Sequence, residues 1–207
     1  MKAPVSRSFV PAATLAMALL VSACGSDSPD ALLASAQDYL SRNDAPAAII
    51  QLKNVLKDRP DSAKARLLLG QALQATGDIA GAETEFRKAQ DLGAASDEVV
   101  PQLAQALLLG KQFGKITTDY ALLQLASAPA QASLKTTVAI AWLRQGQEDK
   151  FRASIDEALK AKADHVPALI ELVRASAQRG NIDEALAGLD KIPRQSSGAD
   201  EAHKLRG

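Results

Sequence analysis

Breaks in the helical pattern of hydrophobic and polar residues recur along this chain about every 34 residues. Apolar residues follow a helical spacing over most of the chain, and a pair of turn-forming residues interrupts them at each break. The spacings between successive pairs are 34, 69 and 34 residues, and the pairs are Asn43-Asp44, Gly77-Asp78, Gly146-Gln147 and Gly180-Asn181. Gly and Asn suit a helix end because both adopt a left-handed conformation at little cost. The fixed period predicts stacked helical hairpins.

Residues of similar size recur at fixed positions when the repeats are numbered from Pro29, Ala63, Asp97, Ala132 and Val166. Positions 8 and 20 are mostly small, which lets the two helices of a repeat approach closely. Position 8 holds Ala36, Gly70, Ala104, Ala139 and Val173, position 20 holds Ala48, Ala82, Ile116, Phe151 and Ala185, and position 24 holds Leu52, Phe86, Tyr120, Ile155 and Leu189. These rows resemble the tetratricopeptide repeat. The resemblance implies an all-α solenoid of antiparallel helix pairs, with about five repeats over residues 30–198 and an incomplete sixth over residues 199–207.

The third repeat departs from this pattern at several positions. Lys111 stands at position 15, where the other repeats have Gly or Asn, and Gly110 comes one place earlier. Ile116 replaces a small residue, and the second helix also contains Thr117 and Thr118, which are poor helix formers. We therefore expect the third repeat to be the least regular.

The N-terminal residues 1–23 have the features of a signal peptide. Lys2 and Arg7 precede a mostly apolar run over residues 9–21, which is too short to span a bilayer. The run ends in Val21, Ser22, Ala23 and Cys24, which resemble a bacterial lipobox. That resemblance implies cleavage before Cys24, acylation of its sulfur, and a lipidated tether over residues 24–29. The alternative is a secreted protein that is cleaved after Ala23 and keeps a free thiol.

Composition and charge narrow the function classes. The chain is 47% apolar and only 3% aromatic, and its formal charge is zero. The sequence shows no basic face large enough to indicate nucleic-acid binding. The two histidines, His165 and His203, are far apart, which predicts neither a metal site nor a cofactor. The acidic pairs Glu83 with Glu85 and Asp156 with Glu157 lie on expected outer helix faces, without a pocket. The sequence therefore indicates a protein that is not an enzyme and has no evident small-molecule substrate.

The expected binding surface is the concave groove that the first helices of such repeats form. Position 9 faces this groove and holds Gln37, Gln71, Gln105, Ile140 and Arg174. The glutamines are candidates for hydrogen bonds to an extended peptide backbone, because each amide has a donor and an acceptor. The alternative is a solvated face without a binding role. Some tetratricopeptide domains bind the C-terminal carboxylate of a partner with a clamp of Lys and Asn side chains. Those positions hold Leu33, Gln37, Leu67 and Gln71 in this chain, so we expect no such clamp.

Other conspicuous side chains are expected to have structural roles. Trp142, Tyr39 and Tyr120 occupy packing positions, and we interpret them as core residues. His165 lies between two expected helices, next to Asp164, and we expect a solvated loop histidine there.

Residues 32–112 make the resemblance more specific. They include Leu-Leu-Ala-Ser-Ala-Gln-Asp-Tyr-Leu and Asp-Glu-Val-Val-Pro-Gln-Leu-Ala-Gln-Ala-Leu-Leu-Leu-Gly. With the lipobox, they resemble tetratricopeptide lipoproteins of the PEP-CTERM (exosortase) system in Gram-negative bacteria that make exopolysaccharide. Members of that family are several times longer, which implies that this chain is the N-terminal part of a longer array.

This resemblance implies a lipid-anchored scaffold for protein or peptide partners, located in the Gram-negative cell envelope. Gly25 follows Cys24 where inner-membrane lipoproteins have Asp, which favours the outer membrane with the repeats facing the periplasm. Two alternatives stay open: a lipoprotein of outer-membrane protein assembly or pilus biogenesis, and the binding half of a larger enzyme.

Overall fold

The computed structural model describes residues 28–193 and 204, and in that part of the chain the regular structure is entirely helical. Successive helices pair as antiparallel hairpins. They are α1 (Pro29–Ser41), α2 (Ala45–Asp58), α3 (Ala63–Ala75), α4 (Ile79–Asp91), α5 (Ser96–Leu109), α6 (Phe113–Tyr120), α7 (Ala128–Arg144), α8 (Glu148–Ala161), α9 (Val166–Gln178) and α10 (Ile182–Asp190). The expected all-α solenoid is confirmed. The signal peptide, the lipobox with Cys24 and all of residues 199–207 except Lys204 lie outside the described residues.

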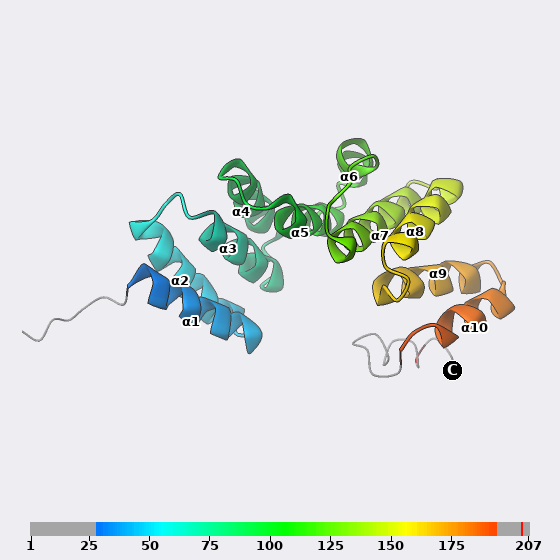
Figure 1. Cartoon of the computed structure of the whole chain (residues 1–207), viewed down its shortest axis with the longest axis horizontal. Coiled ribbons are helices and arrows are strands. Elements are labelled where there is room, and N and C mark those ends of the chain that lie inside the picture. Colours follow the sequence, from blue (N-terminus) through cyan, green and yellow to red (C-terminus); the bar gives the residue numbers. More distant parts are fainter. Residues whose placement is uncertain (1–27, 194–203, 205–207) are drawn as a thin grey trace, which may run out of the picture.

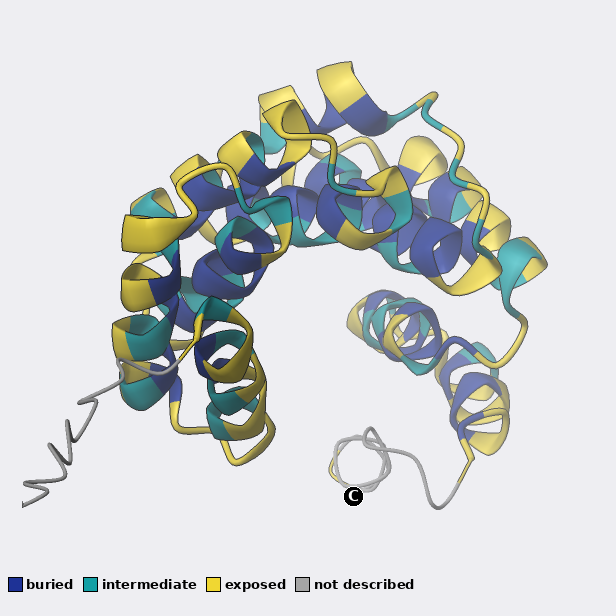
Figure 2. Ribbon diagram, turned by 60° about the vertical axis from the view of Figure 1, so that its left-hand side comes forward, coloured by how far each residue is buried: buried dark blue, intermediate teal, exposed yellow. Residues whose placement is uncertain are grey.

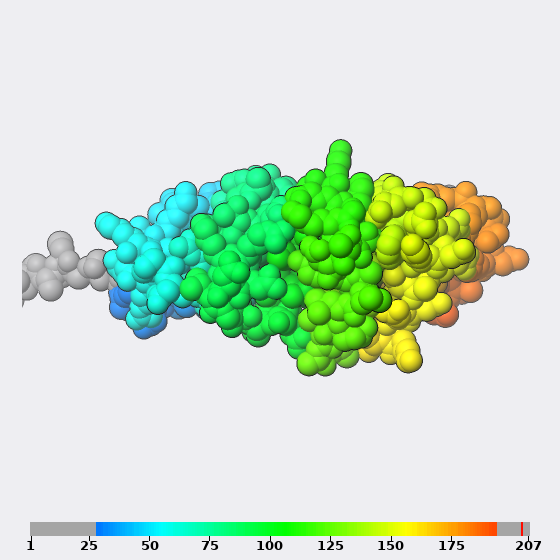
Figure 3. All heavy atoms as spheres, turned by 90° about the horizontal axis from the view of Figure 1, so that it is seen from above, coloured from blue at the N-terminus to red at the C-terminus, as the bar shows by residue number. Residues whose placement is uncertain are grey.

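The helix pairs stack in sequence order along one axis, with α1 and α10 at opposite ends (Figures 1 and 3). The stack bends into an open arc (Figure 2). In Figure 1, α4 and α6 lie above α3 and α5, on the outer side of this arc. The first helices of the middle repeats therefore line its inner side.

The sequence provides clear start signals for half of the helices in the described part of the chain. Each of five N-cap residues accepts a hydrogen bond at its side-chain oxygen from the backbone N–H three residues on, and they are Ser28, Asp44, Ser62, Asp78 and Ser127. Such a cap satisfies an N–H group that has no partner within the helix.

Position 15 has the same backbone conformation in all five repeats. Asn43, Gly77, Lys111, Gly146 and Gly180 have φ angles of 60°, 85°, 56°, 73° and 79°. In each turn the backbone N–H of position 16 donates to the backbone carbonyl of position 11, with N–O distances of 2.8–3.0 Å. This is the hydrogen bond of a Schellman motif. In the third repeat the left-handed residue is Lys111, while Gly110 keeps φ at −75°. The turn geometry therefore persists where its glycine is missing.

We expect Lys111→Gly to raise the free energy of unfolding by about 0.5–1 kcal/mol, since an L-residue with a side chain is strained at φ 56°. Urea denaturation measures the change. Asn43→Gly is the matched control and should gain less, because Asn tolerates this conformation better. A loss of stability in Lys111→Gly would contradict the assignment of strain to this residue.

The apolar core forms a continuous line of clusters along the arc. The residues at positions 8, 20 and 24 are buried in every repeat, as the recurring sizes predict. Among the described residues there are four clusters in chain order, and partly buried side chains join them. Leu73 packs against the first and second clusters, Trp142 against the second and third, and Leu159 against the third and fourth. Each repeat is therefore stabilised by its neighbours, as in other solenoids.

The third repeat is irregular, as expected. Its second helix, α6, has only 8 residues, and the Thr117 hydroxyl within it donates to the carbonyls of Phe113 and Gly114. Helix α7 then begins at Ala128, one turn before Ala132. The Asp97 carboxylate accepts hydrogen bonds from the backbone N–H groups of Ala126 and Ser127 at 3.0 and 2.9 Å, which ties the start of α7 to α5.

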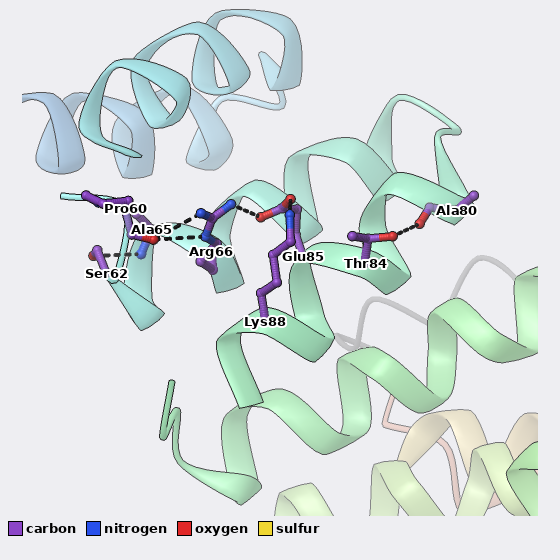
Figure 4. Close-up of polar contacts among 8 residues, drawn as sticks. All are labelled: Pro60, Ser62, Ala65, Arg66, Ala80, Thr84, Glu85 and Lys88. Carbon is purple, nitrogen blue, oxygen red and sulfur yellow. Dashed lines mark hydrogen bonds and ion pairs between the residues drawn. The ribbon is translucent and has the colours of Figure 1, made fainter. Parts of the chain in front are cut away.

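A polar network joins α3 and α4 in the second repeat (Figure 4). Arg66 donates to the Glu85 carboxylate at 2.8 Å and to the Pro60 carbonyl, and Lys88 donates to the other Glu85 oxygen at 2.8 Å. Burial opposes ionisation of Glu85, but the hydrogen bonds from Lys88 and Arg66 and their charges outweigh it. The pKa of Glu85 is therefore lower than its ordinary value of 4.5.

This lowered pKa predicts an acid-sensitive contribution to stability. The contribution is complete above the unfolded pKa near 4.5 and is lost as the pH falls through the lower pKa of the folded state. We expect Glu85→Gln to reduce stability at pH 7 and to flatten the decline below pH 4.5, as measured by urea midpoints across pH. Asp91→Asn is the control, because Asp91 forms no ion pair with a described residue. An unchanged acid decline in Glu85→Gln would count against this network.

Candidate functional site

Two hollows on the inner side of the arc lie between the first helices of successive repeats. One, of about 470 Å³, lies among α5, α7 and α9, and the other, of about 380 Å³, among α3, α5 and α7. Pro101, Gln102 and Ser133 line both hollows, so the two form one continuous groove. We call this surface the α3–α9 groove. Its lining includes four residues from position 9, the position expected to face it: Gln71, Gln105, Ile140 and Arg174.

The structure distributes the expected groove residues unevenly. Gln71 lines the hollow among α3, α5 and α7, while Gln105 and Arg174 line the one among α5, α7 and α9. Gln37 is exposed on α1 and lines neither hollow. Among the described residues, none forms a hydrogen bond with the side-chain amides of the three glutamines. Two of the three candidate amides therefore lie in the groove with donors and acceptors available.

The charged groups of the α3–α9 groove are largely paired with each other. Lys64 on α3 lies 3.4 Å from Glu98 on α5, and Arg174 lies 2.5 Å from Glu171 on α9. The Asp97 carboxylate accepts the two backbone hydrogen bonds at the start of α7. Because these charges have partners within the chain, the groove favours an uncharged stretch of a bound segment over a strongly charged one.

His165 is not the solvated histidine that its position between two helices suggested. It is the N-cap residue of α9, is only 9% exposed, and lines the hollow among α5, α7 and α9. Its Nε2 atom is buried without a hydrogen-bond partner. Burial lowers the pKa of His165, the positive charge of Lys162 lowers it further, and Asp164 raises it. The prediction was wrong because α9 packs against α7 and encloses the loop that carries this residue, which the sequence pattern does not reveal.

The other conspicuous side chains have structural roles. Trp142 is half-buried between two core clusters, and the Lys150 ammonium lies 4.3 Å from the centroid of its ring. Tyr39 packs against the core of the first repeat, and Tyr120 is buried in that of the third. In the acidic pairs, Glu83, Glu85 and Glu157 each form ion pairs with basic side chains.

Neither a metal-binding cluster nor a membrane-spanning helix occurs among the described residues. Between residues 28 and 193 no group of three or more His, Cys, Asp or Glu side chains could hold a metal ion. None of the described helices is both long and apolar enough to cross a membrane.

Comparisons with known proteins agree with this architecture. Two tetratricopeptide repeat profiles match residues 33–97 and 143–207, together more than half of the chain. No curated protein matches it. The structure of PilF from Pseudomonas aeruginosa is similar, with a TM-score of 0.69 and 17% identity over 86% of this chain and 80% of PilF.

Two further solved structures share the fold. A thermophilic tetratricopeptide protein from Thermus thermophilus has a TM-score of 0.69 and 18% identity, over 86% of this chain and 97% of its own. PilW, a type IV pilus biogenesis factor, has a TM-score of 0.65 and 18% identity, over 87% of this chain and 80% of PilW. These low identities show the fold alone, and this fold is typically a scaffold for protein–protein interaction. From the repeat profiles and the helical architecture together, the chain belongs to the tetratricopeptide repeat family.

Proposed function

We propose that this protein is a lipid-anchored scaffold of the Gram-negative cell envelope, whose α3–α9 groove holds an extended segment of a partner protein. The observation that carries the binding part is the groove itself, which crosses four helices and contains the amides of Gln71 and Gln105, neither of which has a hydrogen-bond partner among the described residues. An extended segment has a backbone N–H and C=O at every residue except proline, and a side-chain amide can pair with either. Gln37 on α1 would extend the same contacts beyond the hollows.

Replacement of the three glutamines tests the groove directly. We expect Gln37→Ala, Gln71→Ala and Gln105→Ala together to weaken the affinity for a partner recovered from the envelope by about 10-fold or more, because each lost hydrogen bond contributes about 0.5–1.5 kcal/mol. The matched control is Gln51→Ala with Gln90→Ala, which changes the second helices α2 and α4 instead. Unchanged affinity in the triple variant, or an equal loss in the control, would refute the amide contacts.

The membrane part of the proposal rests on the resemblance of Val21, Ser22, Ala23 and Cys24 to a lipobox. Acylation of Cys24 would anchor the repeats at the outer membrane with a tether over residues 24–29, facing the periplasm. Growth with a fatty-acid analogue should label the wild-type protein and leave Cys24→Ala unlabelled. Equal labelling of both would contradict the anchor, and the free-thiol alternative would then stand.

The process we propose is protein sorting by the PEP-CTERM (exosortase) system, in connection with exopolysaccharide. Its support is the resemblance of residues 32–112, together with the lipobox. Crosslinking from the envelope with the acylated protein should recover components or substrates of that sorting system. Recovery of general chaperones alone would count against a dedicated sorting role.

Pilus biogenesis is the second candidate, and the fold shared with PilF and PilW favours it over other envelope roles. The same crosslinking experiment separates the two candidates, because recovery of pilus components would support this one. Neighbouring genes for an exosortase or for polysaccharide export would favour the first. Outer-membrane protein assembly and a role as the binding half of a larger enzyme rest on no observation of the described residues.

A further inference from the structure

His165 lies at the junction between the fourth and fifth repeats, in the loop that leads from α8 into α9. It is the N-cap residue of α9, but its side chain forms no cap hydrogen bond. Its Nε2 atom is buried without a hydrogen-bond partner. In the described part of the chain, this nitrogen therefore has neither a donor nor an acceptor to pair with.

This environment tolerates the neutral imidazole better than the charged one. In the neutral ring the proton can lie on Nδ1, which leaves Nε2 as an unpaired acceptor, whereas the imidazolium carries a proton on both nitrogens. Protonation of His165 would therefore bury a charged donor without an acceptor, which costs more than burial of an unpaired neutral atom. The N-terminal end of α9 also carries a partial positive charge, which disfavours another positive charge beside it.

The charged groups near His165 do not compensate for this cost. Burial lowers the pKa of His165 below its ordinary value of 6.5, the positive charge of Lys162 lowers it further, and Asp164 raises it. Among the described residues, these two are the charges that act on the imidazole. In the hollow that His165 lines, Glu171 and Arg174 of α9 pair with each other, and the polar side chains from α5 and α7 are uncharged.

Small and partly buried side chains hold the junction beside His165. From α9, Ala168 and Ala175 are buried in a cluster with residues of α7 and α8, and Leu172 is only partly buried against it. At the preceding junction, by contrast, α5 and α7 bury leucine and valine side chains from both helices. Separation of α9 from α7 therefore exposes less apolar surface than separation of α7 from α5. Two partly exposed ion pairs also cross the junction, where such pairs contribute little: Arg152 with Glu184 and Arg179 with Glu148.

We infer that acid regulates the α3–α9 groove, because protonation of His165 separates α9 from α7 and removes the hollow that these helices line. Helices α7 and α9 belong to successive repeats, so the hollow exists only while the two repeats stay packed together. The inference rests on the proposed function of the groove and adds its regulation, since acidification would release a bound segment. Opening of the junction itself requires no partner.

The direction of the pH effect follows from the two states of His165. In the open junction the imidazole reaches water and regains its ordinary pKa of 6.5, whereas the closed junction has the lower pKa. The closed state is therefore fully favoured above pH 6.5, and its advantage is lost as the pH falls from 6.5 through the lower pKa. Histidines are the side chains whose ordinary pKa lies in this range, and the chain has two, His165 and His203.

Hydrogen exchange of the full chain, measured by mass spectrometry and corrected for the intrinsic pH dependence of exchange, reports this opening. From about pH 7.5 to about pH 5.5 we expect the protection of α9 amides to fall about 5- to 10-fold, because the opening equilibrium shifts by up to about tenfold per pH unit below the ordinary pKa. Protection of α3 should stay unchanged. His165→Leu cannot take up a proton and should lose this pH dependence, whereas His203→Gln should keep it.

Three results would overturn the inference. They are unchanged protection of α9 in the wild-type chain, an equal loss of protection in α3, and a pH dependence of α9 that survives in His165→Leu. The comparison of α9 with α3 needs no variant, so a folding defect in His165→Leu would leave the test intact. Failure here would leave the proposed groove untouched, because the glutamine variants test binding at a single pH.

Discussion

Truncation of Phe86 to alanine is expected to lower the free energy of unfolding by about 3–5 kcal/mol, the largest change predicted for any single residue of this protein. The Phe86 side chain is fully buried at position 24 of the second repeat, within the cluster that joins the second, third and fourth repeats. Removal of its ring leaves a cavity where neighbouring repeats meet, and a solenoid depends on those contacts for its stability. Urea denaturation followed by circular dichroism measures the loss.

The space for this ring depends on Gly70, which provides a sharper test of the same contact. A Cβ atom placed on Gly70 would lie 2.5 Å from Cε1 of Phe86. Gly70→Ala is therefore expected to cost about 1–3 kcal/mol, although alanine is the better helix former. The control is Gly114→Ala in α6, where a Cβ meets no atom within 4 Å and should stabilise by up to about 1 kcal/mol. The same sign of change at both glycines would contradict the close approach of α3 and α4.

The second large effect concerns Lys135, a charged residue that is only 1% exposed. Its ammonium lies 2.7 Å from a carboxylate oxygen of Glu157 on α8 and donates to the Ala121 carbonyl, just after α6, also at 2.7 Å. The Glu157 side chain is 51% exposed, so the two partners differ in their access to water. Loss of the carboxylate would leave a buried positive charge with one neutral partner, whereas loss of the ammonium leaves a carboxylate that water can solvate.

This asymmetry predicts that Glu157→Ala destabilises the fold more than Lys135→Met does. We expect about 3 kcal/mol for Glu157→Ala and about 1–2 kcal/mol for Lys135→Met, because methionine retains much of the packed volume. In the Lys135→Met background, Glu157→Ala should cost little. Comparison of the three variants by urea denaturation gives the coupling between the two residues. A larger loss in Lys135→Met than in Glu157→Ala would show that packing, and not charge, dominates here.

The periodic features of the sequence predicted the regular part of the fold. Gly or Asn at position 15 favours the left-handed turn in four of the repeats, and the size of residues at positions 8, 20 and 24 determines how closely helices pack, so both can be recognised without coordinates. The left-handed turn at Lys111 was not predicted by its residue type. The same reasoning identified Thr117 and Thr118 as signs of an irregular third repeat. It also placed Gln71 and Gln105 on the surface that forms the α3–α9 groove.

Residues whose roles arise from departures from the repeat were not predictable in this way. Lys135 has its partners because α6 ends early and exposes the Ala121 carbonyl toward α7. His165 is buried because α9 packs closely on α7, although its sequence context is that of a polar turn. Such contacts depend on how three helices are placed relative to one another. The spacing of residue types along the sequence gives no information on that placement.

The central claim, that partners bind on the inner side of the arc, can be tested by photocrosslinking from two isoleucines. Ile140 lines the α3–α9 groove, and Ile50 is 60% exposed on α2, outside the groove. The same photoreactive amino acid would replace each residue in turn, and irradiation would follow in the envelope of the native bacterium. Our account predicts a discrete adduct with a partner protein from position 140 and none from position 50. An adduct from position 50 without one from position 140 would contradict it.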